Sequence, residues 1–304
     1  FATILVATNR ERVDLTEVQA IEFAKRNNTH VVRWPVLISP NSDGWINKPS
    51  DVTAAKENDP IFFQHWVPKS LSFCLLNVSP PKHVGNGTGF ECHSLTCVDE
   101  EQQEFLDHCV RTMPFGSVIT LKEAPRSANF RLFPDLELQD RLAMWEEHVQ
   151  CPSLVENDTI LPLYADTANK SYYKFRDFSK PQLVRGKNGV DAFFPSKVRI
   201  KLPIPFELGF AITIHKAQGR TLSRIILSIS KGQRRLTFPA IFVAFSRVRR
   251  AKDMRLLLVD SGKSYDSLQY LTQLKPPAHF KPFFENINKE TGKWDSKKAY
   301  ESFL

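Results

Sequence analysis

The chain has 304 residues, 42% of them hydrophobic, so it is long enough to bury one large core or two modest ones and is not a disordered tail. No apolar run approaches the length of a membrane-spanning helix, and no stretch has the charged, apolar and small-residue order of a secretory signal. The sequence therefore predicts an intracellular protein that is not secreted and has no membrane partner.

Two further features concern the origin of the chain and its cysteines. The chain begins with Phe1, directly before an apolar stretch, which predicts that it is cut from a longer protein at a domain boundary. Its five cysteines are an odd number in a chain too large to need disulfides, so reduced thiols are expected. A zinc site would have to be assembled from Cys92, Cys97, His108 and Cys109, but no CxxC pair occurs and no metal site is predicted.

The net charge of +8 is unevenly distributed. Residues 91–166 carry 5 basic and 15 acidic side chains, residues 167–200 carry 8 basic and 2 acidic, and residues 201–255 carry 12 basic and 2 acidic. A basic block of this density favours a polyanionic partner, the alternative being a solvated basic surface.

The first predicted elements form a strand, a helix and a strand. Residues 3–7 are a continuous apolar run, typical of a strand buried on both faces of a parallel sheet. Residues 14–28 have apolar side chains at helical spacing, with acidic residues early and basic residues late, as the helix dipole favours. Residues 30–34 predict a second strand, which would complete a β-α-β unit.

The middle of the chain has a different pattern. Residues 35–60 predict a polar, proline-punctuated loop, and residues 61–96 predict short strands between turns. The acidic stretches 100–110 and 136–149 predict helices, and residues 172–199 mix aromatic and basic side chains around a turn at Gly186 to Gly189.

Regular α/β patterning returns after Pro205. Strands are predicted at 208–215, 225–229 and 255–259, and a helix at 238–246. The simplest architecture is a three-layer α/β lobe interrupted by an inserted, partly β module. The tail at 262–304 is left unassigned.

Three clusters of polar residues follow or end these elements. The first is Thr8-Asn9-Arg10-Glu11-Arg12, at the carboxyl end of a predicted parallel strand, where open α/β sheets bind their ligands. The second is the stretch from Thr213 to Leu222, whose hydroxyl, imidazole, ammonium, amide and guanidinium groups suit phosphate oxygens or a nucleic-acid backbone. The alternative for both clusters is a polar loop that is exposed to solvent and binds no ligand.

The third cluster is Val243-Ala244-Phe245-Ser246-Arg247-Val248-Arg249-Arg250. If the apolar part is helical, it anchors in the core and fixes Arg247 at the edge of the lobe. A rigidly mounted arginine at such an edge is how a neighbouring nucleotide site receives an arginine finger.

Four segments, in chain order, resemble the signature blocks of Pif-type helicases, the RecD-related branch of helicase superfamily one. They are residues 5–14, 83–88, 210–222 and 242–250. The blocks Ile212 to Leu222 and Val243 to Arg250 are the most specific, and residues 97–200 match no block of the family.

The resemblance implies a fold and a set of partners. The fold is an α/β, RecA-like lobe of the P-loop NTPase type, with an inserted Src-homology-three-like barrel. The implied division is 1–96 for the first part of the second RecA-like lobe, 97–200 for the insert, 201–261 for the rest of the lobe and 262–304 for a tail. The implied partners are ATP with Mg²⁺, single-stranded DNA, duplex junctions and an N-terminal RecA-like lobe of the same polypeptide.

The resemblance also implies roles for single residues. Thr213 and His215 would lie near the single-stranded DNA backbone, Gln218 and Gly219 would couple the nucleotide to it, and Arg247 would reach the γ-phosphate. The residues assigned to nucleic acid are Thr213, His215, Lys216, Asn86 and Thr88; those assigned to the nucleotide are Asn9, Arg10, Gly219 and Arg247; and those assigned to catalysis are Arg247 and Gln218.

One departure from the family is important. The phosphate loop is absent, since Ser261-Gly262-Lys263-Ser264 lacks the glycine five positions before Gly262, where Leu257 stands. The leading interpretation is thus the C-terminal motor half of a 5′ to 3′ DNA helicase, inactive as an ATPase alone, from the nucleus or mitochondrion if eukaryotic. The alternatives are a nucleic-acid tether without motor activity and a protein-interaction scaffold that uses the acidic block at 91–166.

Overall fold

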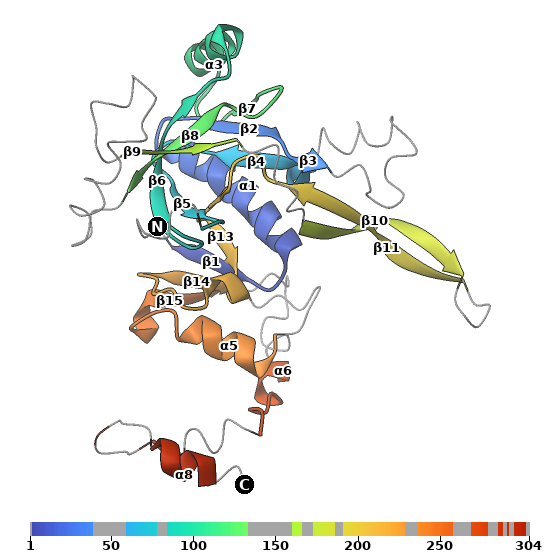
Figure 1. Ribbon diagram of the computed structural model, residues 1–304, viewed down its shortest axis with the longest axis vertical. Coiled ribbons are helices and arrows are strands. Elements are labelled where there is room, and N and C mark those ends of the chain that lie inside the picture. The colour runs from blue at the N-terminus through green and yellow to red at the C-terminus, as the bar shows by residue number, and fades with distance from the viewer. Residues whose placement is uncertain are drawn as a thin grey trace. The chain divides into compact units, whose positions relative to one another are not determined.

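The computed structural model of the protein divides into two compact units (Figure 1). Unit 1 comprises residues 1–12 and 212–304, and unit 2 comprises residues 13–211. The structure describes residues 2–38, 59–77, 84–132, 160–165, 173–185, 191–228, 236–257, 269–278, 285–287, 291 and 295–301. The predicted helix at 136–149, the turn at 186–189 and the Ser261 to Ser264 segment lie outside these residues.

Unit 1 is built on a four-stranded sheet with the order β13-β1-β14-β15. The strands are β1 (Thr3–Val6), β13 (Ala211–Thr213), β14 (Ile225–Ser228) and β15 (Met254–Leu257). β1 and β14 run parallel with Thr3 opposite Ile225, and β14 and β15 run parallel with Ile225 opposite Met254. The predicted strands at 3–7, 225–229 and 255–259 are confirmed, as is the mixed α/β fold with a parallel sheet.

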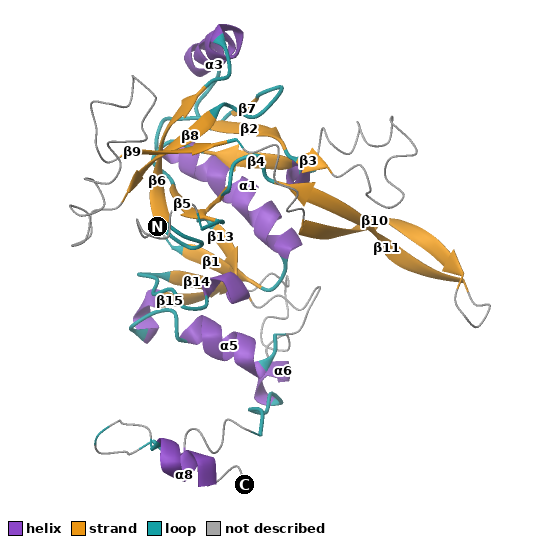
Figure 2. Ribbon diagram, in the orientation of Figure 1, coloured by secondary structure: helices purple, strands orange, loops and turns teal. Residues whose placement is uncertain are grey.

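Short helices complete unit 1 (Figure 2). They are the 3₁₀ helices η4 (Ile214–Ala217) and η5 (Ala251–Asp253) and the α-helices α5 (Phe238–Phe245), α6 (Gln269–Thr272) and α8 (Ser296–Glu301). α5 confirms the predicted helix at 238–246, and Pro239 in its first turn costs no hydrogen bond because the first N–H groups of a helix have no partner within it.

Helix α1 (Asn9–Arg26) begins five residues earlier than its apolar spacing predicts. Thr8 explains the early start, because its Oγ1 accepts a hydrogen bond from the Glu11 N–H at 3.2 Å and its carbonyl accepts from the Arg12 N–H at 3.1 Å. Thr8 therefore caps the helix and Glu11 is its third residue, the spacing of a capping box.

The prediction of a β-α-β unit is wrong. β2 (Val31–Pro35) does not join the sheet of β1 but lies between β4 (Phe63–Trp66), which is antiparallel, and β7 (Val118–Thr120), which is parallel. The order of helix and strand is as predicted, but strand pairing depends on contacts between distant parts of the chain. The partners of β2 lie 28 to 34 residues away in β4 and 87 residues away in β7.

The larger sheet of unit 2 has five antiparallel strands in the order β12-β5-β6-β8-β9. They are β5 (Leu71–Cys74), β6 (Gly89–Thr96), β8 (Ser127–Leu132), β9 (Ile160–Tyr164) and β12 (Phe206–Leu208). This sheet joins strands from both sides of the predicted boundaries at 96 and 200, and the division into domains and the barrel-like insert stay predictions.

A third sheet and two helical segments complete unit 2. The hairpin of β10 (Tyr173–Arg185) and β11 (Asp191–Lys201) pairs through β11 with β3 (Leu37–Ile38). η1 (Pro60–Phe62) precedes β4, and α3 (Glu100–Thr112) confirms the helix predicted at 100–110. Among the described helices, none combines the length and the apolar character that crossing a membrane requires.

The continuous strand predicted at 208–215 is interrupted at Gly209. β12 ends before this glycine in the five-stranded sheet, and β13 begins after it in the parallel sheet. The Gly209 N–H donates to the Leu71 carbonyl at 2.7 Å, and a Cβ at position 209 would lie 2.7 Å from Leu71 Cγ. Glycine at this position leaves room for the Leu71 and Phe73 side chains where the chain changes sheets.

Candidate functional site

The carboxyl ends of β1 and β14 lie at the same edge of the parallel sheet of unit 1. After β1 come Asn9 and Arg10, the first two residues of α1, with Asn9 exposed and Arg10 half-buried. The Ser228 hydroxyl at the end of β14 donates a hydrogen bond to Glu11 Oε1. This edge of the sheet therefore presents the positive end of the α1 helix dipole. The Glu11 carboxylate beside it already accepts a hydrogen bond from the Ser228 hydroxyl.

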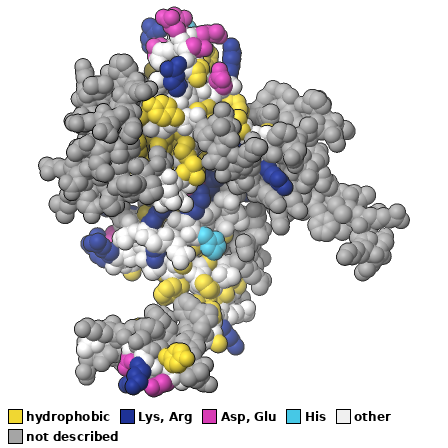
Figure 3. All heavy atoms as spheres, viewed as in Figure 1, with side chains coloured by type: hydrophobic (Ala, Val, Ile, Leu, Met, Phe, Trp, Pro, Cys, Tyr) yellow, Lys and Arg dark blue, Asp and Glu magenta, His cyan; other side chains and the backbone are white. Residues whose placement is uncertain are grey.

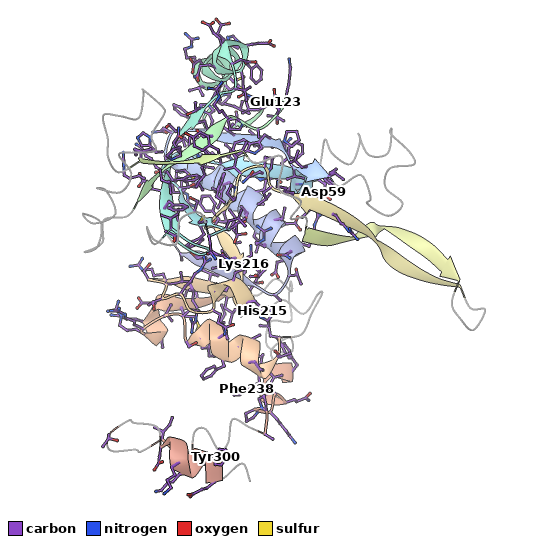
Figure 4. All side chains as sticks on the ribbon, in the orientation of Figure 1. Asp59, Glu123, His215, Lys216, Phe238 and Tyr300 are labelled. Carbon is purple, nitrogen blue, oxygen red and sulfur yellow. The ribbon has the colours of Figure 1, made fainter. Side chains whose placement is uncertain are left out.

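The segment 213–221 leaves β13 as the 3₁₀ helix η4 and a turn. Thr213, the residue before η4, is 8% exposed, whereas His215 and Gln218 are exposed and Lys216 is half-buried. Figure 4 shows the labelled His215 and Lys216 on this short helix. The structure thus brings His215, Lys216 and Gln218 to one exposed turn and buries the Thr213 side chain beneath it.

Gly219 shapes the end of this turn. Its φ is +81°, in the left-handed region, and the Arg220 N–H donates to the Ala217 carbonyl at 3.1 Å. A Cβ at position 219 would meet no heavy atom within 4 Å. The glycine is therefore required by backbone conformation, and the space beside it is open to a ligand.

Arg247 connects this turn to the end of α5. Its Nη1 donates to the carbonyls of Arg220 at 3.1 Å and Ala217 at 3.4 Å, and its Nε donates to the Val243 carbonyl at 2.9 Å. In return the Leu222 N–H donates to the Arg247 carbonyl at 2.8 Å. The second and third polar clusters of the sequence therefore form one hydrogen-bonded site.

The two arginines that follow differ from Arg247. Arg249 is exposed, and Arg250 Nε binds Asp253 Oδ2 at 2.7 Å. The hydrogen bond from Arg250 is the main reason why the pKa of Asp253 is lowered, with the nearby charges of Arg250, Lys252 and Arg224 adding to it. Arg250 is therefore engaged in a local ion pair, and Arg249 is the better control for Arg247.

Asn86 and Thr88 belong to unit 2. They form a turn in which the Thr88 hydroxyl accepts from the Gly85 N–H at 3.0 Å and the Asn86 N–H donates to Asn77 Oδ1 at 3.0 Å. The turn closes onto β5, since the Gly87 N–H donates to the Cys74 carbonyl at 2.8 Å. These contacts give the turn a structural role, and its assignment to nucleic acid stays a prediction.

The residues found by sequence reasoning leave out part of this site. Ser228 and Asp253 each hold one of its elements and were not singled out, and the backbone bond of Leu222 to Arg247 was not expected. Glu11 belongs to the first predicted cluster, and the Thr8-x-x-Glu11 spacing of a capping box was the sequence signal for its place in the first turn of α1. Among the described residues, no group of three or more His, Cys, Asp and Glu side chains is placed to hold a metal ion.

In chemical terms the site consists of hydrogen-bond donors. The guanidinium of Arg247, the Gln218 amide, the His215 ring, the Lys216 ammonium and the first turn of α1 are the groups that bind phosphate oxygens in proteins. Phosphate of a nucleotide or of a nucleic-acid backbone is thus the ligand chemistry to which this set of groups is suited.

The structure resembles solved Pif1 helicases. No family model and no curated protein matches the sequence. The chain is similar to Pif1 helicase from Candida albicans, with a TM-score of 0.41 and 15% identity, over 90% of this chain and 49% of that one. It is similar to Bacteroides Pif1 bound to ssDNA, with a TM-score of 0.42 and 13% identity, over 97% of this chain and 47% of that one.

A third structure is Bacteroides Pif1 in complex with ADP-AlF3 and ssDNA, with a TM-score of 0.40 and 14% identity, over 95% of this chain and 46% of that one. The chain therefore spans about half the length of the solved structures it matches.

Proposed function

We propose that this chain is the C-terminal motor part of an ATP-dependent DNA helicase of the Pif type, moving 5′ to 3′ on single-stranded DNA. The observation that supports this most is the contact of Arg247 with the carbonyls of Ala217 and Arg220. It joins the two most specific sequence blocks of the family, which lie about thirty residues apart in the chain. Such a link is what a motor needs if nucleotide and DNA are to influence each other.

The turn at 213–221 is proposed to bind the DNA backbone. His215 is exposed, Lys216 carries a positive charge beside it, and residues 201–255 contain 12 basic and 2 acidic side chains. Thr213, being buried, is proposed to support this turn and to reach DNA only if the turn opens. Asn86 and Thr88 are proposed as secondary contacts, and duplex junctions as the substrates that the whole protein opens.

The nucleotide is proposed to be ATP with Mg²⁺, held mainly by an N-terminal RecA-like lobe outside these 304 residues. This chain contains no phosphate loop, so alone it is expected to hydrolyse no ATP above background. Its own groups fit phosphate, because Asn9, Arg10, Gln218 and Arg247 are donors and the Glu11 carboxylate accepts from Ser228. When bound, ATP would supply the γ-phosphoryl group that is transferred to water, and Mg²⁺ would neutralise charge on the phosphate oxygens.

Arg247 is proposed to stabilise charge on that group. Its guanidinium would exchange the carbonyls of Ala217 and Arg220 for γ-phosphate oxygens, while Gln218 and Gly219 on the released turn pass the change to DNA. By the same resemblance, the protein is proposed to act in DNA repair or recombination in the nucleus or mitochondrion, if eukaryotic.

The test is DNA-stimulated ATP hydrolysis and unwinding of a forked duplex by the full-length protein. Arg247→Ala should lower turnover by about a thousandfold or more, a thousandfold being the low end of what such arginines supply. It should change DNA affinity without nucleotide only slightly, because the bond from the Leu222 N–H to the Arg247 carbonyl still ties the turn to the end of α5. Arg249→Ala, which removes an exposed guanidinium from the same block, should have a milder effect. Near-normal turnover of Arg247→Ala with loss of DNA binding would mean that the role given to this arginine is wrong.

A further inference from the structure

A second feature, in unit 2, is unrelated to the phosphate-binding site. Helix α3 begins at an N-cap, Asp99, whose carboxylate accepts from the Gln102 N–H at 2.9 Å. Beside its first turns lies a pocket of about 190 Å³, bounded by the helix and by the loop after β7. The pocket has the size of one bulky side chain rather than of a small-molecule ligand.

Val98, Phe105 and Leu121 give the pocket its apolar surface. Leu121, 1% exposed, and Phe105 on the helix, 47% exposed, both line it. The helix is anchored by Leu106, which packs against the core, and by Cys109, which is buried, whereas Phe105 is left half-exposed. An aromatic ring left exposed beside an apolar pocket is typical of a surface that buries a partner's side chain.

The rim of the pocket is acidic. Residues 97–126 carry six acidic and three basic side chains, in a chain whose net charge is +8. Figure 3 shows acidic and basic side chains gathered over α3. Glu101 pairs with Lys122 at 3.3 Å, but both side chains are more than four-fifths exposed, so this pair is weak and easily exchanged.

Glu123, labelled in Figure 4, also lines the pocket. Its backbone carbonyl accepts from Gln102 Nε2 at 3.3 Å, and the loop is thereby tied to the helix while the side chain is exposed. Among the described residues, its carboxylate forms no ion pair. The rim therefore has acidic groups available for a cationic partner.

We propose that the α3 pocket, defined by Phe105, Leu121, Glu101 and Glu123, docks a basic peptide segment of a partner protein through one bulky apolar anchor residue. The anchor fills the pocket against Phe105 and Leu121, and lysines or arginines on either side of it face Glu101 and Glu123. Charge complementarity selects the partner, since DNA and acidic peptides are repelled by the same rim.

The experiment uses the 304-residue chain and fluorescence anisotropy of a labelled synthetic peptide of lysines and arginines with one central phenylalanine. Binding is expected, with affinity falling as salt rises. Phe105→Ala should weaken it about tenfold, as expected for an interface residue that packs against the anchor. Glu123→Lys should also weaken it, and Val110→Ala, which trims another exposed residue of α3 away from the pocket, should not.

Two comparison peptides separate specific docking from simple charge attraction. Replacing the central phenylalanine with alanine should weaken binding as much as Phe105→Ala does, and replacing the cations with glutamates should abolish it. The proposal is overturned if the cationic peptide does not bind, if the alanine peptide binds equally well, or if Phe105→Ala binds like the unchanged chain. It is also overturned if sedimentation shows the chain pairing with a second copy of itself and Phe105→Ala abolishes this pairing. Thermal melting checks that each variant is folded.

Discussion

Arg247 donates a hydrogen bond from Nη1 to the main-chain carbonyl of Arg220 at 3.1 Å. The guanidinium that sequence resemblance assigns to a phosphate thus binds the backbone of the neighbouring turn. Because the same side chain also reaches Ala217 and Val243, it holds the turn against the end of α5.

The first prediction is that Arg247 stabilises unit 1 in the absence of nucleotide. Arg247→Ala removes a charged donor from three backbone carbonyls. The free energy of unfolding should fall by about 1.5–3 kcal/mol, the range for hydrogen bonds to charged groups. Thermal or urea unfolding of the 304-residue chain measures it. Arg249→Ala, at an exposed position, should unfold like the unchanged protein, and equal stability of the two variants would show that the contacts of Arg247 contribute nothing.

The second prediction concerns Gly219. At φ +81°, alanine places its Cβ close to the following carbonyl, which costs about 1–2 kcal/mol, although no neighbouring side chain obstructs it. Gly219→Ala should therefore lower stability modestly and weaken single-stranded DNA binding because the turn is displaced. Gly219→Asn, which tolerates the left-handed region better, should recover part of both losses. Identical behaviour of the two variants would mean that backbone conformation is not what this position requires.

The third prediction concerns the core of unit 2, where buried Gln64 joins β4 to the segment before β12. Its Oε1 accepts from Trp34 Nε1 at 3.0 Å and from the Ile204 N–H at 3.2 Å, and its Nε2 donates to the carbonyls of Ile204 at 2.7 Å and Phe206 at 3.0 Å. The Ile204 carbonyl also accepts from the Phe206 N–H at 2.8 Å, but Gln64→Leu removes the acceptor of Trp34 Nε1 and of the Ile204 N–H. The substitution should therefore lower the free energy of unfolding by about 3 kcal/mol, since each orphaned buried group costs about 1–3 kcal/mol. Gln103→Leu, on the exposed face of α3, is the matched control. If Gln64→Leu lowered the free energy of unfolding no more than Gln103→Leu does, the hydrogen bonds of Gln64 would not stabilise the core.

The fourth prediction is a loss of stability at high pH that involves Cys92. Burial raises the pKa of its thiol from 9.0 to about 11. The unfolded chain therefore releases this proton at lower pH than the folded chain, so the stabilisation is complete below pH 9 and is lost as the pH rises toward 11. The free energy of unfolding, measured by urea titration across this range, should fall less steeply in Cys92→Ala. Equal slopes would contradict the prediction, and tyrosines and lysines contribute equally to both proteins.

The parallel strands of unit 1 were predictable because β1 and β14 are short apolar runs buried on both faces, a pattern local to each strand. The pairing of β2 with β4 and β7 was not, since it depends on contacts between segments far apart in the chain. The start of α1 was missed because apolar spacing ignores a capping residue, although Thr8 and Glu11 carried the signal.

The two segments that form the candidate site were recognisable as polar clusters, but their geometry was not predictable. Residue types pointed to the 213–222 and 243–250 segments, because a dense set of donors is costly to bury without a ligand. Nothing in the residue types says that Arg247 binds the carbonyls of Ala217 and Arg220, since every residue has a carbonyl. The burial of Thr213 was likewise invisible, because a threonine before a turn is as often exposed.

The most direct test of the central claim is a titration of fluorescently labelled oligo-dT with the 304-residue chain at several salt concentrations. Weak binding is expected, with log affinity falling linearly with log salt because basic side chains of unit 1 displace counterions from DNA. Lys216→Ala should weaken binding and make the slope shallower by about 0.7, the value for one phosphate of a single strand. Lys122→Ala, which removes an exposed charge of the same kind from unit 2, should leave both unchanged. No binding at the lowest salt, or an equal loss in the two variants, would contradict the claim that the 213–221 turn contacts DNA.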